Sequence, residues 1–172
     1  MPLARSIAVV LLGIAFSATS TAEEKAAFVH KLKPGDVPPA MLGISRGGDD
    51  VKTTDFAGKV LVTTFWASWC APCRAEMDAL EKIQRIAKDN LQVVAVNIED
   101  RDTFRKVTRS LHDWQMILAN DQYKRHADTY GVKGIPHMLI IGRDGKVQKV
   151  HRGYSETFLK TLIEDVIAAL DK

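Results

Sequence analysis

The sequence predicts a single α/β domain in which helices flank a central mixed sheet, giving three layers. Strand-like apolar runs alternate with segments of helical periodicity from residue 59 onward, a pattern typical of parallel strands joined by crossover helices. An Asp144-Gly145 pair between two strand-like runs is typical of a hairpin, so the sheet should finish antiparallel. A chain of 172 residues, 46% of them apolar, suffices for one substantial core and is too short for two ordinary domains.

The amino-terminal residues have the pattern of an export signal. Arg5 supplies an early charge, residues 7–16 form an apolar run, and Ser20-Thr21-Ala22 offers small residues for cleavage. We therefore expect residues 1–22 to be a signal peptide and residues 23–172 to be a periplasmic or otherwise extracytoplasmic domain. One alternative is an uncleaved membrane anchor, although the apolar run is shorter than the about 20 residues that a bilayer span needs. The other is a buried amphipathic helix, although the run lacks a polar face.

Charge and motif content exclude several function classes. The 24 Lys and Arg residues are interspersed with 21 Asp and Glu residues and form no long block, so we expect no nucleic-acid partner. Both common phosphate-loop patterns are absent, so we expect no nucleotide cofactor, and no other cofactor is indicated. Two cysteines in an exported chain of this length do not make a disulfide scaffold, and their spacing therefore calls for a chemical explanation.

The predicted elements follow in order along the chain. A polar, Lys-rich segment at residues 23–35 forms an N-terminal extension, and one or two short edge strands precede residue 55. The remaining elements are assigned from apolar periodicity, capping residues and turn residues. They are strands at 60–66, 92–98, 115–119, 137–141 and 147–151, and helices at 72–88, 102–111, 122–130 (ended by Gly131) and from the capping Ser155 to about residue 170.

The cysteine pair stands where the first long strand leads into a helix. Cys70 and Cys73 are separated by Ala71-Pro72, and a first helical turn tolerates proline. Such a turn brings two sulfurs within bonding range, while the free N–H groups and the positive dipole end stabilise a thiolate. Cys70, at the exposed edge, should be the attacking sulfur, and Cys73, one turn further in and more buried, should resolve the mixed disulfide.

The residues around this pair carry a family resemblance that covers about residues 34–170. Residues 66–74, WASWCAPCR, resemble the active-site signature of thioredoxins, and Ile135-Pro136 before a strand resembles their cis-proline loop. The match is closer to the TlpA/ResA/CcmG branch of exported thiol–disulfide reductases, because of the Gly58-Lys59-Val60-Leu61-Val62 strand, the Cys-x-x-Cys-Arg-x-Glu run and the export signal. This resemblance implies a thioredoxin-like fold for the domain.

The resemblance also implies partners. The chain should reduce oxidised proteins, such as apocytochrome c or a copper-centre assembly protein, and should receive electrons from a membrane donor of the thiol-reducing type. We expect it to act as a monomer and to bind no metal.

In this family the proline matching Pro136 is cis and faces the two sulfurs, and the backbone of Ile135 would pair with an extended substrate segment. An ordinary trans-proline loop is the alternative. Trp69 should form part of the docking surface, whereas Trp66 should pack in the core.

Glu76 is the third residue after Cys73 and should start near the same helix end as the sulfurs. In ResA-like proteins the matching glutamate influences cysteine ionisation, since a carboxylate near a thiol raises the thiol pKa, and we expect it to relay protons here. A solvated glutamate in an early helical turn is the alternative. Thioredoxin itself has a buried aspartate where this chain has Thr64, so a general-base role falls to Glu76 or to water.

A metal site is the main rival interpretation. The five histidines do not pair at zinc-finger spacing and no second cysteine pair exists. The alternative function is a copper-binding or metallochaperone-type protein that uses Cys70, Cys73 and His137, which follows Pro136 and could face the sulfurs. As a cation, His137 could instead stabilise the thiolate, or it could be a partly exposed strand residue. Arg74 breaks the Cys-x-x-Cys-His pattern of haem attachment, and the Pro-x-x-x-Thr-x-x-Cys setting of peroxiredoxins is absent.

Overall fold

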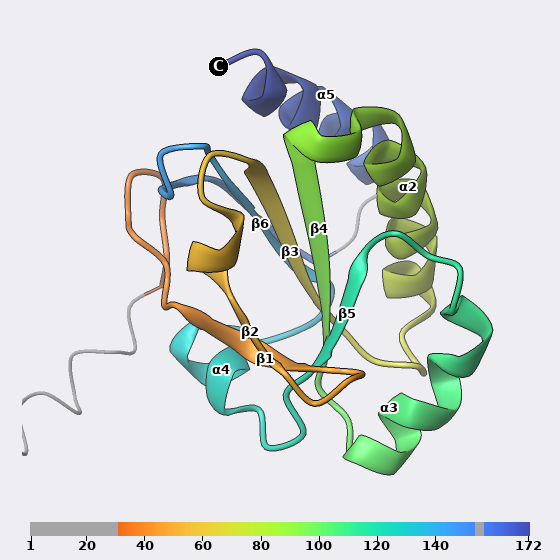
Figure 1. Ribbon diagram of the computed structural model, residues 1–172. Coiled ribbons are helices and arrows are strands. Elements are labelled where there is room, and N and C mark those ends of the chain that lie inside the picture. Colours follow the sequence, from red (N-terminus) through yellow and green to blue (C-terminus); the bar gives the residue numbers. More distant parts are fainter. Residues whose placement is uncertain (1–30, 154–156) are drawn as a thin grey trace, which may run out of the picture.

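The computed structural model describes residues 31–153 and 157–172, so the predicted signal peptide and the predicted cap at Ser155 lie outside the described residues. Within these ranges one mixed sheet of seven strands has the order β2-β1-β5-β4-β3-β6-β7 (Figure 1). No helix in the same ranges combines the length and the apolar content that crossing a membrane requires.

Three parallel strands form the centre of the sheet. They are β3 (Val60–Trp66), β4 (Leu91–Asn97) and β5 (Ile117–Asn120), and β4 pairs with both of the others. All seven residues of β3 are buried, which explains why this strand shows a continuous apolar and β-branched run instead of alternation. The strand that leads into the cysteine pair is therefore held on both sides and on both faces.

Antiparallel strands complete both borders of the sheet. The predicted hairpin is present as β6 (His137–Ile141) and β7 (Val147–Arg152), with β6 paired to β3. The predicted short strands are β1 (Met41–Ser45), which pairs with β5, and β2 (Asp50–Lys52) at the border. The segment before β1 crosses to β7, where the Gly35 N–H donates to the Val147 carbonyl at 2.8 Å and the Val147 N–H donates to the Asp36 carbonyl at 2.9 Å.

Helices cover both faces of the sheet, which confirms the three-layer prediction. Helices α2 (Ala71–Ala87), α3 (Arg101–Val107) and α5 (Phe158–Leu170) pack on one face, and Figure 1 shows α2 and α5 side by side there. The other face is covered by α4 (Arg125–Thr129) and the segment at Leu32. Because side chains alternate along a strand, β3 contributes Val62 and Trp66 to the first core and Leu61 and Phe65 to the second.

Two helices are shorter than the periodicity predicts. The helix predicted at 102–111 ends at Val107 and continues as a 3₁₀ turn at Arg109–Leu111. The helix predicted at 122–130 begins only at Arg125, because Lys124 has a left-handed backbone with φ of 56° that cannot continue a helix. Gly131, with φ of 69°, ends it as predicted.

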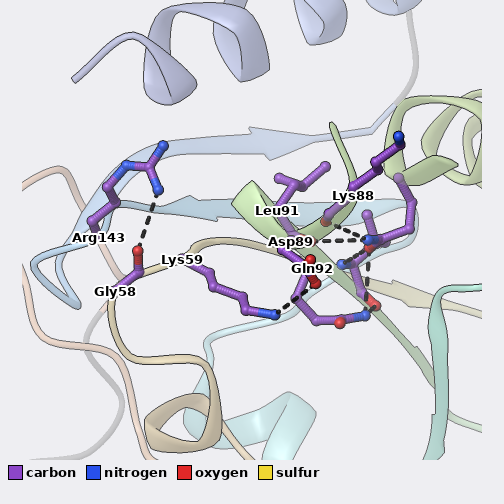
Figure 2. A network of polar contacts seen from close by, with 9 residues as sticks. Gly58, Lys59, Lys88, Asp89, Leu91, Gln92 and Arg143 are labelled. Carbon is purple, nitrogen blue, oxygen red and sulfur yellow. Dashed lines mark hydrogen bonds and ion pairs between the residues drawn. The ribbon is translucent and has the colours of Figure 1, made fainter. Parts of the chain in front are cut away.

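The carboxyl end of α2 is fastened to the sheet. The buried Gln84 side chain donates to the Leu91 carbonyl at 2.8 Å and accepts from the Val93 N–H at 2.6 Å, which fixes the helix to the start of β4. Figure 2 shows Leu91 and, at the same end of the sheet, Lys59 and Asp89, whose ion pair is 3.8 Å long. The Gln84 hydrogen bonds hold the end of the 17-residue helix that lies opposite to Cys70.

Candidate active site

The cysteine pair lies at the amino end of α2, as the sequence predicts. Cys70 is the N-cap residue and Pro72 lies in the first turn. Cys70 and Cys73 are joined by a disulfide with an S–S distance of 2.02 Å, and the Cys73 N–H donates to the Cys70 sulfur at 3.3 Å. A thiolate on Cys70 would accept the same hydrogen bond at the positive end of the helix dipole, which stabilises its charge.

The two sulfurs differ in access in the predicted order, but Cys70 is less open than expected. Cys70 retains 5% of its surface and Cys73 retains 1%, so both belong to the first core. Trp69, directly before Cys70, keeps 71% of its surface, whereas Trp66 keeps 3% and packs in the core. The role of Trp69 in docking stays a prediction.

Glu76 is buried in the core, so the alternative of a solvated glutamate is wrong. Its side chain has no exposed surface, and one carboxyl oxygen accepts a hydrogen bond from the Thr64 hydroxyl at 2.5 Å. The other oxygen has no partner among the described residues. Burial raises the pKa of Glu76 from 4.5 to about 7, although the Thr64 hydrogen bond opposes part of that rise.

The Thr64–Glu76 contact shows that the buried acid near the cysteine pair comes from α2 and not from β3. Thr64 occupies the strand position six residues before Cys70, and α2 supplies the carboxyl group one turn after Cys73. A group with a pKa near neutrality can hold or release a proton at the working pH, which is the requirement for a general acid or base. The proton-relay role of Glu76 stays a prediction.

Glu99 is a site residue that sequence reasoning missed. Its carboxylate accepts from the Ser68 N–H at 2.6 Å, from the Ser68 hydroxyl at 2.9 Å and from the Asn97 amide at 3.0 Å. The Arg74 guanidinium donates to the Ser68 carbonyl at 3.2 Å from the other side of the turn. Ser68 lies two residues before Cys70, so these bonds fix the loop that carries it. The sequence signal that could have indicated Glu99 is its position just after a buried strand that runs parallel to β3.

The Ile135-Pro136 bond is cis, which confirms that prediction. Pro136 is buried, and Ile135 is half-buried against both cores. The pairing of Ile135 with a substrate strand stays a prediction.

His137 does not point to the sulfurs, so the alternative in which it faces them is wrong, and its burial also contradicts a partly exposed strand residue. It pairs in register with Phe65, and the two rings meet edge to face with centroids 6.2 Å apart, on the face of the second core. The ring keeps 1% of its surface, and burial together with Arg152 lowers the pKa of His137 to about 4. A cationic His137 that stabilises the thiolate is therefore not formed near neutral pH.

The described part of the chain contains no cluster of three or more His, Cys, Asp or Glu side chains that could hold a metal ion. Cys70 and Cys73 belong to the first core, whereas His137 lies on the second face. The arrangement thus presents two sulfurs that can be joined or separated, a buried acid near neutrality and an exposed aromatic ring.

Comparison with known proteins places the chain among thiol-exchange proteins. The Redoxin family model matches residues 33–167. Thioredoxin-like protein YneN of Bacillus subtilis is 36% identical over 109 residues, which are 62% of this chain and 64% of YneN. Thiol-disulfide oxidoreductase ResA of Bacillus thuringiensis is 27% identical over 125 residues, 72% of each chain.

A solved structure from Chlorobium tepidum, described as a thiol:disulfide interchange protein DsbE, aligns with a TM-score of 0.74 and 33% identity. The alignment covers 81% of this chain and 99% of that one. The structural similarity therefore extends over nearly the whole of that chain, and the Redoxin match over residues 33–167 spans both the cysteine pair and the cis proline.

Proposed function

The chain belongs to the Redoxin family, as a TlpA/ResA/CcmG-like member of the thioredoxin superfamily, and we propose that it is an exported thiol–disulfide oxidoreductase that reduces disulfides in partner proteins. The observation that carries this proposal is the Cys70–Cys73 disulfide at the amino end of α2. The names of the relatives support it, since ResA is a thiol-disulfide oxidoreductase and DsbE a thiol:disulfide interchange protein.

The reaction moves two electrons to the partner. In the reduced protein the Cys70 thiolate attacks one sulfur of the partner disulfide, forms a mixed disulfide and expels the other partner sulfur as a thiolate, which takes up a proton. The Cys73 thiol then loses its proton and attacks the Cys70 sulfur. The partner leaves with its second sulfur reduced, and the Cys70–Cys73 disulfide is the oxidised product.

The second step needs a proton acceptor, and Glu76 is our candidate. It lies one helical turn after Cys73, and its pKa of about 7 makes both protonation states accessible. The carboxylate form, which the second step requires, accepts the Cys73 proton and holds it while the Cys73 thiolate attacks the Cys70 sulfur. Thr64 holds one carboxyl oxygen and leaves the other free to take the proton.

The cellular setting is also part of the proposal. The amino-terminal pattern supports export to the periplasm or its equivalent. Family resemblance favours oxidised apocytochrome c or a copper-centre assembly protein as partner, and a thiol-reducing membrane protein as the electron donor. Exposed Trp69 and the backbone of Ile135 would form the docking surface for both.

Trapping of the mixed disulfide tests the function. In a Cys73→Ser variant the resolving sulfur is absent, so the partner should accumulate as an adduct through Cys70 that dithiothreitol releases and mass spectrometry identifies. A Cys70→Ser variant serves as the control and should trap nothing. Absence of any adduct on Cys73→Ser in the native compartment, together with no reversible two-electron couple in the purified domain, would overturn the proposal.

A further inference from the structure

A cavity of about 500 Å³ opens beside the loop that leads into Pro136. It is lined by Ile135 and its preceding loop, by Lys31 from the segment before β1, and by residues of β6 and β7. Ile135 is the residue whose backbone is proposed to pair with a partner strand. A side chain of such a strand would therefore have this cavity within reach, because alternate side chains of an added strand point to the same side.

The cavity has a cationic lining. Lys31, Lys133 and Arg152 contribute to it, and no acidic side chain does. None of the three cations takes part in an ion pair between described residues. Arg152 donates one hydrogen bond to the Leu32 carbonyl at 2.9 Å, which orients its guanidinium and leaves further N–H groups for a ligand. A concave site with three unneutralised cations favours an anion.

The buried wall of the cavity supplies an independent observation. His137 lines it, keeps 1% of its surface, and has no hydrogen-bond partner for Nε2 among the described residues. Its register partner on β7 is Arg152, so both side chains lie on the same face of the sheet. A buried ring nitrogen without a partner is costly, and such groups usually mark a ligand or water position. The neutral ring can carry its proton on Nε2 and donate it to a carboxylate oxygen.

We propose that this cavity is a specificity subsite for a carboxylate side chain of the disulfide-bearing partner, held by Arg152, Lys133 and His137 next to the strand-pairing residue Ile135. This inference rests on the proposed function and adds to it a substrate class, namely protein disulfides with an Asp or Glu at a fixed distance from the attacked cysteine. Arginine and lysine with a neutral imidazole form a donor set that suits a carboxylate.

Paired synthetic peptides test the subsite. Each peptide carries one intrachain disulfide and blocked termini, and the two members of a pair differ only by Glu or Gln at one of the successive positions on either side of the attacked cysteine. At one position the reduced protein should react with the Glu peptide about tenfold faster than with the Gln peptide. In the Lys133→Gln/Arg152→Gln variant this ratio should fall to about one.

Two controls separate the subsite from general charge effects and from the proposed function. A Lys82→Gln/Lys88→Gln variant loses the same charge from exposed positions on α2 and at its carboxyl end, and should keep the ratio. Equal rates within every pair, or an equal fall of the ratio in this control, would overturn the inference. Peptides with Ser in place of Cys report binding to the oxidised protein without exchange. Tighter binding of the Glu member supports the subsite even if turnover fails, whereas equal dissociation constants reject it.

Discussion

The Thr64 hydroxyl on β3 donates a hydrogen bond to the Glu76 carboxyl on α2, and both side chains have no exposed surface. This contact ties the strand before the cysteine pair to the helix after it. It also places an ionisable group in the core that contains both sulfurs, where solvent cannot screen its charge. The following predictions begin from this contact.

Replacement of Glu76 by Gln should change how stability depends on pH. The folded pKa of about 7 lies above the unfolded value of 4.5, so the folded state holds more protons between these values and the free energy of unfolding falls as pH rises through that window. The full loss is about 3 kcal/mol. We expect the Glu76→Gln variant to lack this pH-dependent loss. In denaturant unfolding of the oxidised protein, the free energy of unfolding of the variant relative to wild type should therefore rise by about that amount from the acid to the alkaline end of the window. The exposed Glu164→Gln variant should show no such gain.

The same substitution should slow the second exchange step. Glutamine cannot accept the Cys73 proton, so release of a partner from the mixed disulfide should slow by about tenfold to a hundredfold at neutral pH. Because glutamine carries no charge, the thiol pKa values should not rise. Stopped-flow measurement of release and ultraviolet titration of the thiolates check both points. Unchanged release across the pH range would remove Glu76 from the mechanism.

Removal of the Thr64 hydroxyl should raise the pKa of Glu76 further. The hydrogen bond is the contribution that opposes burial, so a Thr64→Val variant of nearly the same shape should shift the carboxyl titration upward. Infrared titration of the carboxyl band measures this directly. The Thr64→Ser variant keeps the hydroxyl and should restore the wild-type titration. An unshifted band in Thr64→Val would mean that the contact does not control the ionisation of Glu76.

Truncation of Glu99 should loosen the loop before Cys70. Glu99→Ala leaves the Ser68 N–H and hydroxyl without their acceptor, so the free energy of unfolding should drop by about 2 kcal/mol. If Glu99 positions the cysteine loop, Glu99→Ala should also change the reduction potential and the rate of Cys70 alkylation. Glu99→Gln keeps one acceptor oxygen and should restore part of each of these two quantities. A stability loss with unaltered thiol chemistry would reduce Glu99 to a structural residue.

Truncation of Trp69 should separate protein substrates from small ones. The ring is 71% exposed, so Trp69→Ala should alter stability by about 0.5 kcal/mol or less. We expect kcat/KM for a protein disulfide to fall about tenfold, since exposed aromatic rings often dominate docking, with no change for a small disulfide. Tyr123→Ala removes a ring of 69% exposure from the loop before α4 and is the matched control. Equal losses in both variants would contradict the docking role.

The sequence predicted those parts of the fold that depend on local pattern. Apolar runs without alternation identified β3 and β4, and the Asp144-Gly145 pair identified the hairpin, because each signal lies within one segment. Pairing of β1 with β5 escaped prediction, since it joins segments about 75 positions apart in the chain. The left-handed Lys124, which delays α4, carries no glycine or asparagine signal.

In the candidate site, too, the sequence predicted the features that lie within one segment and missed those that join distant segments. A spacing of three residues placed Glu76 near Cys73 but did not reveal whether its face of α2 is buried, and only the contact with Thr64 settles that. Glu99 was missed because it meets Ser68 across 31 positions of the chain. The face of the sheet on which His137 lies depends on the register between β6 and β3. A shift of one residue would move its side chain to the opposite face.

The borders of the sheet bear on how the protein behaves in concentrated solution. One border strand, β2, has only three residues. At the other border, Gly35 and Asp36 form backbone hydrogen bonds with Val147 of β7. The exposed Arg152 places a charge near the other end of β7. Short, covered and charged edges are poor templates for another copy of the chain. The domain should therefore resist edge-to-edge aggregation and fibre growth at high concentration, even though its central strands are continuous apolar runs.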